Sequence, residues 1–115
     1  FAAVFAPGSR AEVAIAGGSD ALPAGMEISG QIDRLVVEEA RILVIDYKTN
    51  RPAPDNIEGA DPAYVRQMAA YVAVLREAFP GKVVEAALVW TDGPKLMAIP
   101  ENMIGQALAE LMRAP

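Results

Sequence analysis

The chain contains no cysteine and no histidine. The lack of cysteine excludes disulfides, zinc–thiolate sites and thiol nucleophiles. The lack of histidine excludes imidazole metal ligands and catalytic units of the Ser-His-Asp or Cys-His type. The chemistry that remains belongs to carboxylates, lysine and hydroxyl groups. An enzyme with this repertoire is best suited to an oxygen-ligated Mg²⁺ or Mn²⁺ ion.

Basic residues are also scarce, because 10 Lys and Arg stand against 15 Asp and Glu and give a net charge of −5. A domain that wraps nucleic acid by bulk electrostatics normally has a basic excess. Any DNA contact of this chain is therefore expected to be local or supported by a partner. No membrane partner is expected, because no apolar run approaches the ~20 residues of a spanning helix.

The length of 115 residues and the apolar content of 53% fit a single domain, 1–115, with one core. The chain begins at Phe1, and the opening segment Phe1-Ala2-Ala3-Val4-Phe5 has neither the basic start nor the length of a secretory signal. We interpret the sequence as a fragment of a longer chain that lacks its upstream helix.

Apolar alternation and continuous β-branched runs predict five strands separated by turn residues. Met26–Val37 alternates, with Gly30 as a possible bulge. The aliphatic run Ile42–Ile45 suits a central strand buried on both faces, and it should form a hairpin with Met26–Val37. The other strands are predicted at Ala11–Ala16, Val83–Thr91 and Leu96–Ile99.

Two helices are predicted between and after these strands. A Pro-rich loop, Thr49–Gly59, is long enough to suggest a functional role. Asp61 is the expected N-cap of a helix that runs to about Ala78, and Met103–Leu111 forms a terminal amphipathic helix. The order β, β, β, α, β, β, α predicts an α/β fold with a mixed sheet flanked by helices.

Three charged residues have the spacing that phosphodiester hydrolysis needs. Asp33 and Asp46 fall on the two strands of the predicted hairpin, where two acids can converge on one cation. Lys48 shares the face of Asp46, because side chains alternate along a strand with period two. A metal ion stabilises charge on the phosphorus and activates water, while an ammonium orients or deprotonates the nucleophile.

Three segments resemble the PD-(D/E)XK nuclease superfamily, and within it the nuclease domain of RecB-type and AddA-type helicase-nucleases, with AddA the closest. They are similar to the family's Gly-x-Ile-Asp strand, its Asp-Tyr-Lys-[Ser/Thr] signature and its Gln-x-x-x-Tyr helix motif. The segments are Gly30-Gln31-Ile32-Asp33-Arg34, Asp46-Tyr47-Lys48-Thr49-Asn50-Arg51 and Gln67-Met68-Ala69-Ala70-Tyr71. The resemblance implies a restriction-endonuclease-like fold and a Mg²⁺-dependent (or Mn²⁺-dependent) deoxyribonuclease.

The resemblance also implies a role for each matched residue in the signature strands. Asp33 and Asp46 would be metal ligands, and the backbone carbonyl of Tyr47 would be a third. Lys48 would be the catalytic lysine, so that Asp33, Asp46 and Lys48 form the catalytic set. The family's metal-binding histidine, on a helix before the first strand, is not present in this sequence.

Further residues are candidates for supporting the site or contacting DNA. By the resemblance, Gln67 and Tyr71 would do so, although any surface helix produces polar pairs four residues apart. Arg34, Arg51 and Arg66 lie near the predicted site and could neutralise phosphates. Ordinary solvated ion pairs would account for these arginines equally well.

Several readings stay open beside the nuclease. An Asp-x-Lys triplet alone occurs by chance in many proteins, and a nuclease-like domain can lose its chemistry and remain as a scaffold for DNA or for a subunit. Glu12 is a possible additional acid near the site. Tyr64 and Trp90 are interpreted as packing residues.

By the same resemblance, the domain would belong to an ATP-dependent helicase-nuclease that processes double-strand breaks for recombinational repair in the bacterial cytoplasm. ATP would bind only to the motor of the parent chain, and an AddB-like subunit would be the protein partner beside DNA. The missing upstream helix should leave an apolar surface that Phe1, Val4 and Phe5 cover, or that self-association covers.

Overall fold

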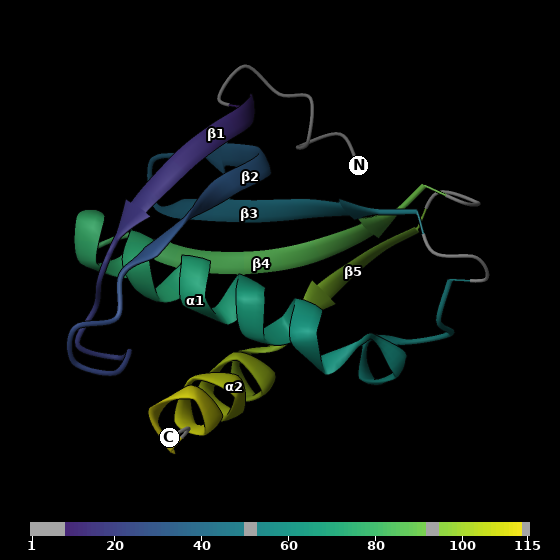
Figure 1. Ribbon diagram of the computed structural model, residues 1–115. Coiled ribbons are helices and arrows are strands. Elements are labelled where there is room, and N and C mark those ends of the chain that lie inside the picture. Colours follow the sequence, from purple (N-terminus) through teal and green to yellow (C-terminus); the bar gives the residue numbers. More distant parts are fainter. Residues whose placement is uncertain (1–8, 50–52, 92–94, 114–115) are drawn as a thin grey trace.

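One mixed sheet of five strands forms the body of the protein in the computed structural model, which describes residues 9–49, 53–91 and 95–113 (Figure 1). The order across the sheet is β1-β2-β3-β4-β5, the same as along the chain. β3 and β4 are parallel, and the other neighbouring strands are antiparallel. The strands are β1 Ser9–Gly17, β2 Ile28–Val37, β3 Arg41–Lys48, β4 Val83–Trp90 and β5 Lys95–Ile99.

Two helices accompany the sheet. α1 (Pro62–Ala78) makes the crossover that the parallel pair β3–β4 requires, and it packs against the sheet. α2 (Glu101–Arg113) packs against α1, as Figure 1 shows. The Asp61 side chain caps α1 by accepting a hydrogen bond from the backbone N–H of Ala63 at 2.9 Å, and Pro62 is the first helical residue.

The predicted element order and the α/β mixed-sheet fold are confirmed, including the hairpin of β2 and β3. The predicted helix that starts after Asp61 has the expected bounds, and the other elements differ only by a few residues at their ends. One short 3₁₀ turn, Ile57–Gly59, interrupts the loop before α1. Within the described residues, neither helix is both long and apolar enough to cross a membrane.

The main core lies between α1 and the sheet, and it contains the side chains of Ile42 and Val44. Trp90 also belongs to it and is only 1% exposed, which confirms its interpretation as a core residue. A smaller cluster of Val36, Ile45 and Val89 lies on the other face of the sheet. Both faces of β3 are therefore buried, as its continuous aliphatic run predicts.

The side chains of β1 and β2 change from one face of the sheet to the other at one position along these strands. Ile32 packs in the main core, whereas the side chain of Arg34, two residues on, reaches Tyr47 on the opposite face. Regular alternation would put both on the same face. The neighbouring β1 residue, Glu12, has a left-handed φ of 54°. This inversion sits at Asp33, whose carboxylate turns toward β3.

The expected bulge at Gly30 is not found, because Gly30 pairs in regular register with Ile15. Glycine is needed there for space. A Cβ atom at Gly30 would lie 2.5 Å from the hydroxyl oxygen of Tyr71, which projects from α1 onto β2. Gly30 therefore allows close packing of helix and strand just before the acidic residue Asp33.

Candidate active site

Asp33 and Asp46 meet where β2 and β3 separate. The last Cα pair of the β2–β3 ladder is Arg34 with Ile45, and the same register would place Asp33 opposite Asp46. Instead of a further ladder bond, the Oδ2 atom of Asp33 accepts a hydrogen bond from the backbone N–H of Tyr47 at 2.8 Å. The Asp33 side chain is thereby held in the gap between the strands, where it lies against the carboxyl of Asp46.

Lys48 lies on the same face of β3 as Asp46, as the two-residue spacing predicts. Its Nζ atom is 2.6 Å from Oδ2 of Asp46, and both side chains are largely shielded, at 15% and 16% exposure. The contact is an ion pair without good hydrogen-bond geometry, since Oδ2 is buried and has no aligned partner among the described residues. The same amine lies 3.7 Å from the ring centroid of Tyr64 on α1.

The two carboxyl groups have opposite pKa shifts. The hydrogen bond from Asp46, helped by the N–H of Tyr47 and the charge of Lys48, lowers the pKa of Asp33. Burial, followed by the hydrogen bond to Asp33, raises the pKa of Asp46 to about 6. The pair therefore retains one proton at pH values well above the usual range of an aspartate.

The donor set fits a small divalent cation. Two carboxylates lie together, and the buried Oδ2 of Asp46 makes an ion pair with Lys48 but no aligned hydrogen bond among the described residues. Lys48 turns its carbonyl to β4, where it accepts from Thr91, so the preceding residue, Tyr47, turns its own backbone groups toward β2 and Asp33. Within the described residues no third acid joins these groups. So few protein oxygens suit Mg²⁺, which usually completes its shell with water and substrate phosphates.

The shared proton predicts a pH dependence of stability. Between the ordinary pKa of 3.8 and about 6, folded Asp46 keeps a proton that the unfolded chain has released. The stability from this group is therefore full below the unfolded pKa and is lost as the pH rises through about 6. We expect the free energy of unfolding of the metal-free protein, relative to Asp46→Asn, to fall from pH 4 to pH 7. Chemical denaturation of both proteins measures this difference, and a flat difference would contradict it.

The side chains of Gln67 and Tyr71 contact each other on α1. The Nε2 atom of Gln67 donates to the hydroxyl of Tyr71 at 3.3 Å. Tyr71 is buried, and its hydroxyl rests on β2 at Gly30, three residues before Asp33. This contact ties the helix to the strand that carries the first acid, which is the geometry of a supporting element.

Two of the candidate arginines point elsewhere. Arg34 lies on the sheet face opposite Asp46, where its guanidinium donates to the Tyr47 hydroxyl at 3.0 Å and to Ser9 Oγ at 2.9 Å. Arg66 faces α2 and lies 4.0 Å from Glu110, beside a pocket of ≈ 200 Å³ between the helices. Neither of these contacts brings the guanidinium to the acids.

Other candidates do not join the site in the described structure. Glu12 lies across from Asp33 on β1, but its side chain is exposed and forms no metal-type cluster with the two aspartates. Arg51 lies outside the described residues, as do the three apolar residues expected to cover an open surface, Phe1, Val4 and Phe5.

Tyr64 packs against the main core, as interpreted from the sequence, but its contact with Lys48 was not predicted. Its ring shields the amine of Lys48, so it belongs to the surroundings of the site. A signal was present, because Tyr64, Gln67 and Tyr71 follow one another at helical spacing along one face of α1. That stripe indicates a face of α1 that looks toward the acidic strands.

The sequence profile described as "PD-(D/E)XK nuclease superfamily" matches residues 4–110. Among solved structures, the chain resembles one titled "Crystal structure of SSO0001", with a TM-score of 0.50 and 16% identity over 93% of this chain. At that identity the likeness concerns the fold. The chain spans 52% of the length of that protein. No curated protein matches the sequence.

Proposed function

Because this chain belongs to the PD-(D/E)XK nuclease superfamily, we propose that it is a divalent-metal-dependent deoxyribonuclease domain that hydrolyses DNA phosphodiester bonds. One observation carries the proposal. The carboxylates of Asp33 and Asp46 meet at the opening of β2 from β3, with the amine of Lys48 only 2.6 Å from the buried Oδ2 of Asp46. The family supports nuclease activity. The DNA substrate, the metal ion and the role of each residue are what we propose.

Asp33, Asp46 and the carbonyl of Tyr47 would hold Mg²⁺ or Mn²⁺. When bound, such an ion supplies positive charge that offsets the charge developing on the phosphate. The N–H of Tyr47 fixes the Asp33 carboxylate, so this ligand is positioned before metal or DNA arrives. Lys48 orients the attacking water, and its ammonium adds charge stabilisation in a shielded site.

The finer assignment is an AddA-like domain of an ATP-dependent helicase-nuclease that processes double-strand breaks in the bacterial cytoplasm. The supporting residues are the Asp-Tyr-Lys-Thr run from Asp46 to Thr49 and the hydrogen-bonded pair of Gln67 and Tyr71. The net charge of −5 favours a motor and an AddB-like partner that supply the basic DNA path. Gln67 and Tyr71 support the site in this proposal, with Arg34 bracing Tyr47 from the other face.

A cleavage assay with Mg²⁺, with Mn²⁺ and with a chelator tests the proposal on linear duplex and single-stranded DNA. We expect Asp46→Ala to lower the cleavage rate by roughly a thousandfold or more, because it removes both a metal ligand and the counter-charge of Lys48. Glu39→Gln, which removes one exposed acid in the β2–β3 turn, is the matched control and should cleave normally. DNA binding without metal-dependent cleavage by the wild-type protein would instead identify an inactive scaffold.

A further inference from the structure

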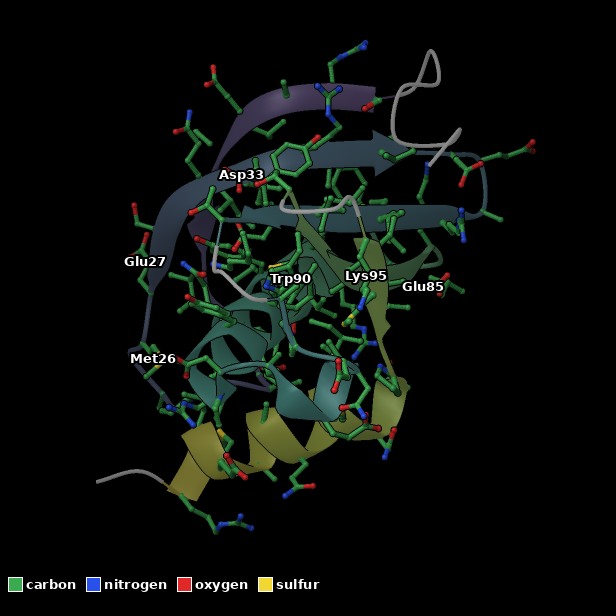
Figure 2. The ribbon with its side chains drawn as sticks, turned by 90° about the vertical axis from the view of Figure 1, so that its right-hand side faces the viewer. Met26, Glu27, Asp33, Glu85, Trp90 and Lys95 are labelled. Atoms are coloured by element: carbon green, nitrogen blue, oxygen red, sulfur yellow. The ribbon has the colours of Figure 1, made fainter. Side chains whose placement is uncertain are left out.

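A pocket of ≈ 470 Å³ lies where β4 ends and α1 begins, next to the proposed catalytic lysine. The residues that line it include Tyr64, Trp90, Pro54, Ala60 and Asp61. Trp90 is the β4 residue paired with Lys48, and it faces the same side of the sheet. Figure 2 views the molecule from this end of β3 and β4, with Trp90 near the centre and Asp33 above it.

The described lining carries no positive charge that would bind a phosphate. None of the described residues around the pocket is a lysine or an arginine, and Asp61 adds a carboxylate at its edge. One oxygen of Asp61 accepts from the N–H of Ala63, so the carboxylate is fixed in place. A neutral, flat ring that carries N–H donors fits these surroundings better than an anion does.

One residue of the lining, Trp90, has a buried polar group without a partner among the described residues. The indole Nε1–H of Trp90 is buried, and within the described part of the chain it makes no hydrogen bond. Buried donors in proteins are nearly always satisfied by protein, by water or by a ligand. Binding that opens the lining at Trp90 would let a ring with a carbonyl or an unprotonated ring nitrogen supply the missing acceptor.

We propose that this pocket is a nucleobase subsite, in which a base next to the cleaved phosphodiester leaves its stack and packs on the ring of Tyr64. The inference rests on the proposed nuclease function. Aromatic side chains bind unstacked bases of any sequence through their faces. Tyr64 lines the pocket, and its ring also lies against the amine of Lys48, which is not among the described lining residues. Tyr64 would therefore contact both the lysine and the base. An occupied subsite therefore holds the ring over Lys48.

Trp90 provides the measurement, because it is the only tryptophan of the chain. A short single-stranded oligonucleotide with a mapped cleavage site is titrated in Ca²⁺ in place of Mg²⁺, and gels verify that the strand stays intact. One abasic residue is then placed at successive positions. We expect one position beside the cleaved bond to weaken binding about tenfold and to remove the change in Trp90 emission.

Variants then locate the effect. Tyr64→Leu should weaken binding of the intact strand to the level of that abasic strand, with no further loss on the abasic strand itself. In Mg²⁺, the two strands should then be cleaved at equal rates. Phe79→Leu is the matched control, because Phe79 is an exposed aromatic at the other end of α1. The Phe79→Leu variant should retain the full difference in binding and in cleavage rate between the intact and the abasic oligonucleotide.

Two results would overturn the subsite. Normal DNA cleavage with no sensitive abasic position would reject it and leave the nuclease function standing. An abasic effect that persists in Tyr64→Leu would place the base elsewhere. If the wild-type protein neither binds nor cleaves DNA, the proposed function fails and the subsite fails with it.

Discussion

Lys48→Ala should lower DNA cleavage by about a thousandfold or more while leaving Mn²⁺ binding nearly unchanged. The amine lies 2.6 Å from Asp46 and is largely shielded from water. Its removal takes away the group that orients water and stabilises charge during the reaction. It leaves the three proposed ligand groups of Asp33, Asp46 and Tyr47 in place.

Calorimetric titration with Mn²⁺ and a parallel cleavage assay separate the two parts of this expectation. Lys95→Ala is the matched control, because it makes the same charge change at an exposed position on β5. Cleavage that stays within a few-fold of wild type would remove Lys48 from the mechanism. Loss of Mn²⁺ binding together with cleavage would show that Lys48 holds the acids in position and does not act on the reaction itself.

The placement of the acids follows from local rules that the sequence displays. The buried run of β3 fixes which of its residues face α1, and that parity puts Asp46 and Lys48 on one face. The short turn between β2 and β3 sets a register in which Asp33 comes opposite Asp46. Asp61-Pro62 likewise determines where α1 starts.

The remaining features depend on geometry that no local pattern encodes. The face change at Asp33 accompanies a left-handed Glu12, a conformation that glutamate rarely adopts and that its sequence neighbours do not predict. Because of this inversion, Arg34 lies on the sheet face opposite Ile32, where regular alternation would put both side chains on one face. The contact of Tyr64 with Lys48 depends on how α1 crosses the sheet, which is a tertiary property.

Gly30→Ala should destabilise the protein by about 1–3 kcal/mol, although alanine normally suits a strand better than glycine. The added Cβ would lie 2.5 Å from the hydroxyl oxygen of Tyr71, so helix and strand must separate. β2 would then shift near Asp33, and cleavage should fall as well. Chemical denaturation and the cleavage assay measure the two effects.

A double-mutant cycle with Tyr71→Phe isolates the cause. Removing the hydroxyl leaves the ring atom Cζ as the nearest contact, at 3.4 Å, which is at the limit of ordinary packing. Tyr71→Phe alone should cost no more than about 1 kcal/mol, because it loses only the 3.3 Å hydrogen bond from Gln67. In that background Gly30→Ala should be nearly neutral, giving a coupling of about 1–3 kcal/mol between the two sites. Additive effects would mean that the cost of Gly30→Ala does not come from a clash with the Tyr71 hydroxyl.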